Sequence, residues 1–218
     1  MIDRRRILKY FLIGVGAALS PLSVQMARHQ PVWALSGRRV VEKKTPMSKL
    51  MHANPARLDT SNLETTPMEK FDVMGETTLQ IDLEEWRLEV DGDVREPYRF
   101  RLAELMDRPR LERNVLLICP GFFAYNGWWT GFSVADLLRE AGCSGTATHV
   151  LFTGSQGFRK KKMRYGIDEV RNDKVFAAYR VNNQELPRRH GFPLRLVADD
   201  HKGTRWLKYL NRITVETR

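Results

Sequence analysis

Short segments in which apolar residues alternate with polar ones, or form an unbroken run, predict most of the strands of this chain. Trp86, Leu88 and Val90 alternate with charged or polar positions and lead to Asp91-Gly92, which is typical of a half-buried strand followed by a turn. The apolar run Val115–Ile118, followed by Cys119, favours a strand that is covered on both faces. Further strands are expected at residues 98–102, 149–152, 175–181, 194–198 and 213–216.

Helical spacing is confined to short segments. Ser133 is a suitable N-cap for a helix over residues 134–141, which Gly142 ends, and a helical turn is expected at residues 103–106. Strands therefore dominate, with a few short helices between them. This pattern predicts one mixed α+β domain with a β-rich core over residues 78–218, without an internal repeat.

Residues 35–77 differ from the domain that follows. They are polar, contain Pro46, Pro55 and Pro67, and have no clear period. We expect an extended arm that covers part of the domain.

The first residues predict an exported protein. A basic opening, Met1–Lys9, precedes the apolar stretch Tyr10–Leu19, whose helix of roughly 15 Å is too short for a hydrocarbon core of about 30 Å. Residues 1–34 are therefore expected to be a signal peptide that is cleaved near Ala34. The segment Arg4-Arg5-x-Ile7-Leu8-Lys9 resembles the twin-arginine signal. This resemblance implies the twin-arginine translocase as a partner, a periplasmic location and export in the folded state, often after cofactor insertion.

The charge of the chain is basic but not concentrated. The formal net charge is +10, and removal of residues 1–34 takes away five basic residues and one acidic residue. The densest basic run, Arg159–Arg164, is interpreted as a solvated loop, with docking of an acidic partner as the alternative. We expect no nucleic-acid partner, because the sequence has no recognisable nucleic-acid-binding module and no regular basic helix.

Cys119 is the main candidate for chemistry. It ends a predicted buried strand directly before Pro120-Gly121, so it is expected on the floor of a pocket. In an oxidising compartment a disulfide with Cys143, the only other cysteine, is an alternative. The sequence has no Cys-x-x-Cys-His motif for covalent haem. The aromatic residues that follow are candidates for a substrate pocket, with ordinary packing as the alternative: Phe122, Phe123, Tyr125 and Trp128.

Three later segments combine glycine with cations or hydroxyls. Glycine lets a backbone N–H approach an oxyanion, and arginine offers a bidentate fork to phosphate. Together the segments suit a small anionic, ring-containing cofactor beside a thiolate. They are Thr153-Gly154-Ser155, His190–Arg195, and Gly203-Thr204-Arg205 with Lys208.

Taken in order, these motifs resemble the sulfite-oxidase-type molybdopterin domain over about residues 65–216. The matching text is Trp86-x-Leu-x-Val-x-Gly92, Cys119, Trp129-x-Gly131, Asp136-Leu137-Leu138, Leu186-Pro187-x-x-His190-Gly191-x-Pro193-Leu194-Arg195-Leu196-Val197 and Gly203-x-Arg205-x-x-Lys208-Tyr209-Leu210.

The resemblance implies a mixed α+β fold with a β-rich core and a molybdenum–molybdopterin cofactor without an attached nucleotide. Cys119 stands at the position of the family's molybdenum ligand, and a thiolate beside a dithiolene suits a transition metal. Tyr125 is the candidate hydrogen-bond donor to a bound oxide. The positions that match cofactor contacts are His190, Arg195, Gly203, Thr204, Arg205 and Lys208, with Thr153 as a weaker match.

Departures from sulfite oxidases point to another substrate. The segment Pro120–Tyr125 has no cation to hold an oxyanion. The exported bacterial branch that includes the catalytic subunit of the periplasmic methionine-sulfoxide reductase is more similar, because Cys119 and Trp129 are spaced as in that branch. However, His190 replaces an Asn of that branch, and residues 68–76 do not reproduce its Asn-x-x-Tyr-Glu segment.

We therefore expect a periplasmic oxidoreductase that transfers an oxygen atom and reduces an uncharged S- or N-oxide. The resemblance implies a separate electron-transfer partner, such as a membrane haem protein. The alternatives are oxidation of sulfite or a related reduced sulfur compound, and a cofactor-binding module without turnover.

Overall fold

The structure is a computed structural model that describes residues 37–156 and 159–217. The predicted signal peptide, residues 1–34, lies outside the described residues. Within the described ranges, no helix combines the length and the apolar character needed to cross a membrane.

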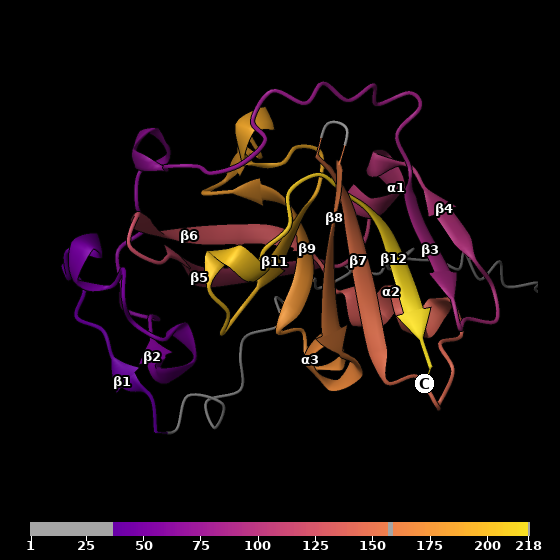
Figure 1. The fold of residues 1–218 in the computed structure, drawn as a ribbon, viewed down its shortest axis with the longest axis horizontal. Helices are drawn as coiled ribbons and strands as arrows, with labels where there is room; N and C mark the ends of the chain where they lie inside the picture. The colour runs from indigo at the N-terminus through magenta and orange to yellow at the C-terminus, as the bar shows by residue number, and fades with distance from the viewer. Residues whose placement is uncertain (1–36, 157–158, 218) are drawn as a thin grey trace, which may run out of the picture.

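Two five-stranded sheets form the framework of the domain (Figure 1). In the first, the order is β10-β9-β6-β5, and β11 also pairs with β9. In the second, the order is β4-β3-β12-β7-β8. Only the β3–β12 pair within these two sheets is parallel. The strands of the first sheet are β5 (Arg110–Cys119), β6 (Phe123–Phe132), β9 (Val175–Val181), β10 (Gln184–Glu185) and β11 (Arg195–Ala198). Those of the second are β3 (Leu88–Gly92), β4 (Tyr98–Phe100), β7 (His149–Gln156), β8 (Arg159–Gly166) and β12 (Leu210–Glu216).

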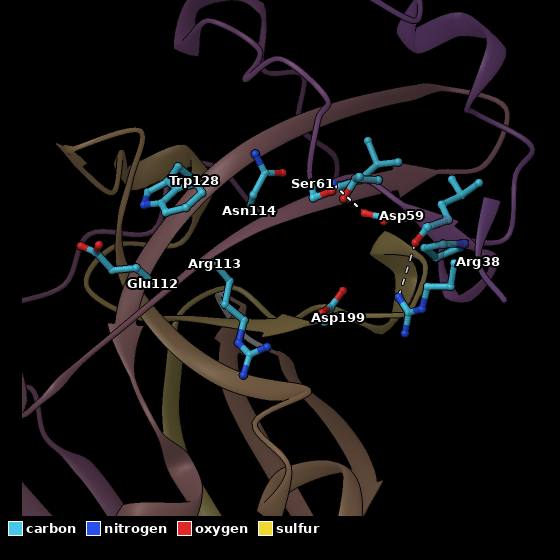
Figure 2. Close-up of a pocket in the computed structure, with 12 residues that line it drawn as sticks. Arg38, Asp59, Ser61, Glu112, Arg113, Asn114, Trp128 and Asp199 are labelled. Carbon is cyan, nitrogen blue, oxygen red and sulfur yellow. Dashed lines mark hydrogen bonds between the residues drawn. The ribbon is translucent and has the colours of Figure 1, made fainter. Parts of the chain in front are cut away.

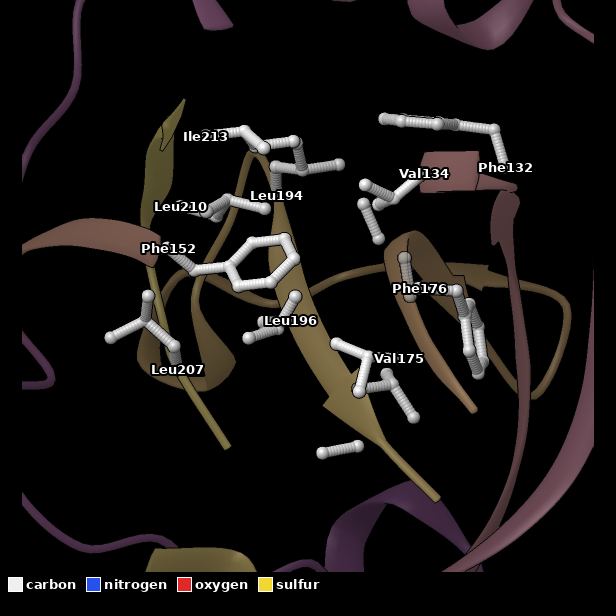
Figure 3. Packing of buried hydrophobic residues seen from close by; sticks show 14 of the residues in the cluster. Phe132, Val134, Phe152, Val175, Phe176, Leu194, Leu196, Leu207, Leu210 and Ile213 are labelled. Atoms are coloured by element: carbon white, nitrogen blue, oxygen red, sulfur yellow. The ribbon is translucent and has the colours of Figure 1, made fainter. Parts of the chain in front are cut away.

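The main core is built from side chains of both sheets (Figure 3). Phe152 and Ile213 of the second sheet share one buried cluster with Phe176 and Leu196 of the first. Every residue of β11 is buried, as expected of a strand covered on both faces. The sequence prediction of a β-rich domain with short helices is confirmed.

In the described part of the chain, three short α-helices complete the domain: α1 (Leu102–Met106), α2 (Val134–Glu140) and α3 (Ile167–Arg171). The Ser133 hydroxyl accepts a hydrogen bond from the Asp136 N–H (3.2 Å), so the predicted N-cap of α2 is confirmed. The same hydroxyl donates to Asp173 Oδ1 (2.5 Å), which ties the start of α2 to the end of α3.

Two of the long strands occupy segments that the sequence did not predict as strands. The aromatic segment after Cys119 is the ten-residue strand β6, paired with β5 along its whole length. The basic run interpreted as a solvated loop lies in β8, paired with β7. Alternation explains the second correction, since Tyr165 is buried and Lys161 and Met163 are half-buried, while Lys160, Lys162 and Arg164 are exposed.

The first part of the predicted arm, residues 37–64, packs on one face of the β5–β6 hairpin, whereas its end, residues 72–75, lies on the other face. The first part contains a small parallel pair, β1 (Arg39–Val40) and β2 (Leu58–Asp59). Asn126 Nδ2 of β6 donates to Leu63 O (2.9 Å) of the arm. A second apolar cluster joins the two parts: Val41, Leu50, Leu58 and Leu63 of the arm with Leu116, Ile118 and Ala124 of the hairpin. Since side chains alternate along a strand, Leu117 and Cys119 face the other way.

Candidate cofactor pocket

A pocket of about 320 Å³ lies on the side of the hairpin that carries Cys119. Four parts of the chain meet there: the end of the arm, the β5–β6 hairpin, strand β8 and the segment from β11 towards β12. The lining residues are Asp72, Val73, Met74, Gly75, Leu117, Cys119, Phe123, Tyr125, Lys161, Arg195, Gly203, Thr204, Trp206 and Lys208.

Cys119 is the last residue of β5 and pairs with Phe123 at the start of β6. The residue is 9% exposed, and its Sγ lies 3.2 Å from the Sδ of Met74. Burial raises the pKa of the Cys119 thiol, so a positive centre is needed to favour the thiolate here.

Both cysteines are free, so the alternative of a Cys119–Cys143 disulfide is wrong for this structure. Cys143 lies just after α2, where its thiol donates to Ser144 O (3.6 Å).

Tyr125 forms an aromatic wall beside the thiol. Its ring stacks on Phe71 with centroids 3.9 Å apart and on Phe123 with centroids 5.9 Å apart. Burial raises the pKa of the Tyr125 phenol. The hydroxyl is therefore neutral at ordinary pH and able to donate a hydrogen bond.

Cations gather in the same pocket. Lys161 Nζ donates to the carbonyls of Thr204 (3.2 Å) and Trp206 (3.1 Å). Lys208 Nζ donates to the carbonyls of Arg189 (3.2 Å) and Glu76. Burial, followed by repulsion from Arg195, lowers the pKa of both lysines, that of Lys208 to about 8. An anion bound among these cations would offset that repulsion.

Arg195 extends from the first residue of β11 between two aromatic rings. Its guanidinium carbon lies 5.4 Å from the ring centroids of both Trp129 and Trp206, and its Nη1 donates to His190 O (2.8 Å). The Nε atom is buried and has no hydrogen-bond partner within the described part of the chain. A fixed guanidinium with a spare donor is suited to an oxyanion.

His190 lies behind the wall of the pocket. It is 1% exposed, and its ring meets those of Tyr125 and Phe71 edge-on. Burial, and then Arg195, Arg189 and Lys208, lower its pKa to about 3. The imidazole is therefore neutral, and because Nε2 accepts from Arg189 Nε (3.1 Å), its proton belongs on Nδ1.

The structure brings together seven of the residues selected from the sequence. Cys119, Phe123, Tyr125, Arg195, Gly203, Thr204 and Lys208 all line the pocket.

Four others lie elsewhere. Phe122 is 67% exposed in the hairpin turn, and Trp128 borders a different pocket beside the arm. Thr153 faces a hollow on the second sheet together with Arg212 and Lys162. Arg205 points towards β8, where it donates to Arg164 O (2.5 Å) and covers the Tyr165 ring.

Sequence reasoning missed Met74, Lys161 and Trp206 as pocket residues. Lys161 was hidden in the basic run, although the period-two pattern of Lys161, Met163 and Tyr165 marks an inward strand face. Met74 belongs to a segment without a period, so only the tertiary structure places it.

The chain is similar to parts of larger enzymes. It is 25% identical over 230 residues to nitrate reductase [NADH] 2 of Arabidopsis thaliana, covering 88% of this chain and 24% of that protein. It is 27% identical over 158 residues to nitrate reductase [NADPH] of Fusarium oxysporum, covering 62% of this chain and 18% of that one. The chain thus spans about a quarter or less of the length of these relatives.

A solved structure has the same fold. The sulfane dehydrogenase SoxCD from Paracoccus pantotrophus aligns with a TM-score of 0.59 and 22% sequence identity. The alignment covers 64% of this chain and 40% of that one.

The pocket fits a molybdopterin by its own chemistry. Cys119 offers a soft thiolate ligand for a transition metal. Arg195, Lys161 and Lys208 offer charge for a phosphate, and the buried Nε of Arg195 is a donor that awaits an acceptor. Residues 74–218, which include all of these groups, match the family described as the oxidoreductase molybdopterin binding domain. The chain therefore belongs to this family.

Proposed function

We propose that the protein is an exported molybdenum–molybdopterin oxidoreductase that reduces an uncharged S- or N-oxide by oxygen-atom transfer. The observation that carries this proposal is the composition of the pocket around Cys119. Cys119 lies among Leu117, Phe123 and Tyr125, whereas the cations of the pocket come from β8, β11 and the segment before β12.

In this proposal the cofactor's metal is held by Cys119 and its phosphate by Arg195, Lys161 and Lys208. When bound, the cofactor supplies a two-electron redox centre that exchanges an oxygen atom with the substrate. We propose the form without an attached nucleotide, because a volume of about 320 Å³ is at the small end of the range for ligand pockets.

The protein's own residues position the substrate. The neutral Tyr125 hydroxyl donates a hydrogen bond to the oxide oxygen, and Phe123 and Met74 exclude water from the space beside Cys119. The overall reaction consumes one S- or N-oxide, two electrons and two protons, and yields the reduced compound and water.

The proposal includes a location and partners. The Arg4-Arg5 signal supports export by the twin-arginine translocase to the periplasm, with cleavage near Ala34. The electrons come from a separate electron-transfer protein, for which a membrane haem protein is our candidate.

A second candidate is turnover of a small oxyanion, through oxidation of sulfite or a related sulfur compound. The observation in its favour is that Arg195 and Lys161 line the same pocket as Cys119. Because the chain is similar to proteins named nitrate reductases, nitrate is a further oxyanion to test.

The test uses the full chain, exported by a host that makes molybdopterin. Molybdenum and released pterin are quantified first. Reduction is then measured with reduced viologen as the electron donor and dimethyl sulfoxide, methionine sulfoxide, trimethylamine N-oxide or nitrate as the substrate. Oxidation of sulfite is measured with ferricyanide as the electron acceptor. We expect one molybdenum per chain and turnover of the uncharged oxides. Turnover of sulfite or nitrate alone would establish the second candidate, and a folded protein without molybdenum and pterin would end both.

A further inference from the structure

A second pocket lies on the other side of the β5–β6 hairpin, between the hairpin and the arm (Figure 2). Its volume is about 290 Å³. It is separate from the cofactor pocket, since no residue lines both. Strand β5 is the edge strand of its sheet, so side chains from both of its faces border this pocket.

Arg113 contributes a buried positive charge to the pocket. The residue is 9% exposed, and its Nε has no hydrogen-bond partner within the described ranges. The nearby Arg38 is already paired with Asp200 through two contacts of 2.7 and 2.9 Å. A buried guanidinium with an unmatched donor is unfavourable unless an acceptor is supplied, and the fork of an arginine matches a carboxylate.

The neighbouring residue, Asn114, contributes a hydrogen-bond acceptor where Arg113 contributes a donor. Asn114 Oδ1 is buried and also lacks a partner within residues 37–156 and 159–217. Asp59, Glu112 and Asp199 line the same pocket, so negative charge surrounds the acceptor. A simple anion would be repelled by these carboxylates, and a simple cation would be repelled by Arg113. Only a ligand that carries both charges matches both sides.

The other lining residues are mostly apolar. They are Pro55 and Leu58 of the arm and Leu116 and the exposed Trp128 of the hairpin, together with the polar Thr60 and Ser61. Figure 2 shows Trp128, Asn114, Arg113 and Asp199 around the hollow. At roughly 30 Å³ for each water in the liquid, the volume corresponds to about ten non-hydrogen atoms.

We propose that this pocket binds a small zwitterion of the size of a free amino acid with an apolar side chain. Its carboxylate lies on Arg113, its ammonium faces Asn114 Oδ1 and the carboxylates, and its side chain lies on Trp128 and Leu116. Bound there, it links the arm to the hairpin that carries Cys119. The proposal does not depend on the reaction at the cofactor pocket.

Calorimetric titration of the full chain with leucine tests the charge requirement. Two analogues each lack one charge: 4-methylpentanoate has no ammonium, and isoamylamine has no carboxylate. We expect a Kd for leucine of about 1 mM or less, with at least about tenfold weaker binding of either analogue. Equal binding of all three compounds would overturn the proposal. So would the absence of a heat signal at leucine concentrations up to roughly 20 times the expected Kd.

Variants separate a binding role of Arg113 from a structural one. Arg113→Met removes a buried donor that has no partner, so we expect an unchanged or higher Tm without ligand and loss of leucine binding by at least about tenfold. The matched control, Arg139→Met on the exposed face of α2, should bind leucine like the wild type, as should Cys119→Ser. If Arg113→Met unfolds, the arginine is structural and the proposal fails, unless the milder Asn114→Ala folds and also weakens leucine binding about tenfold.

Discussion

The Sγ of Cys119 and the Sδ of Met74 lie 3.2 Å apart, although the two residues are 45 positions apart in the chain. Cys119 ends the edge strand β5, whereas Met74 belongs to the segment that connects the arm to β3. Met74 is 49% exposed, so it separates the thiol from solvent on one side of the pocket. Access to Cys119 is therefore controlled by a residue that lies outside the two sheets.

Replacement of Met74 by alanine should open this side of the pocket. In cofactor-free protein we expect Cys119 to react with iodoacetamide roughly fivefold faster, because the truncated side chain no longer covers the sulfur. Mass spectrometry of the modified peptide measures the rate for this cysteine alone. Met106→Ala, which truncates an exposed methionine of α1, is the control and should leave the rate unchanged. An unaltered rate in Met74→Ala would mean that access is set elsewhere.

Replacement of Cys119 by serine should remove the soft ligand and preserve the fold. We expect loss of most of the molybdenum and a fall in activity of at least roughly a hundredfold, since a hydroxyl is a poorer ligand for this metal than a thiolate. Metal analysis and circular dichroism report the two effects separately. Cys143→Ser provides the matched control, because Cys143 does not line the pocket and its thiol donates to Ser144 O. Full metal content in Cys119→Ser would contradict the assigned ligand.

The parts of the fold that could be predicted are those in which local pattern and tertiary environment agree. Val175–Val181 was predicted with its observed bounds, because an apolar run between turn residues matches a strand buried on both faces. Ser133 was predicted as a cap, because its hydroxyl acts within one turn of the chain.

The parts that could not be predicted depend on distant segments. Trp128 and Tyr125 belong to one strand, but only the position of the arm decides that Trp128 borders the second pocket and Tyr125 the first. The long alkyl stem of Lys161 can be buried while its charge reaches an anion. The sequence of the basic run therefore does not reveal that this segment is a strand with one lysine facing the cofactor pocket.

Lys161 and its neighbour Lys160 give a direct test of this arrangement. Lys161 lines the cofactor pocket and Lys160 is exposed on the opposite face of β8. Loss of one charged donor to a phosphate should weaken cofactor retention by about 10- to 100-fold in Lys161→Met. Lys160→Met removes the same charge from the same strand and should retain the cofactor. The released pterin, measured by fluorescence after dialysis, decides between them, and equal losses in both variants would refute the placement of Lys161.

His190 should make the protein sensitive to acid. Its pKa is about 3 in the folded state, held down by burial and by Arg195, Arg189 and Lys208, against 6.5 for an ordinary histidine. Below pH 6.5 the unfolded chain takes up a proton that the folded chain refuses, so this residue lowers the stability as pH falls from 6.5 towards 3. The slope is about 1 kcal/mol for each pH unit in that range. Urea unfolding of the wild type and of His190→Asn between pH 7 and pH 4 measures it, since asparagine does not titrate. The stability of the wild type should fall more steeply than that of the variant, whereas parallel pH profiles would show that His190 accepts its proton in the folded state.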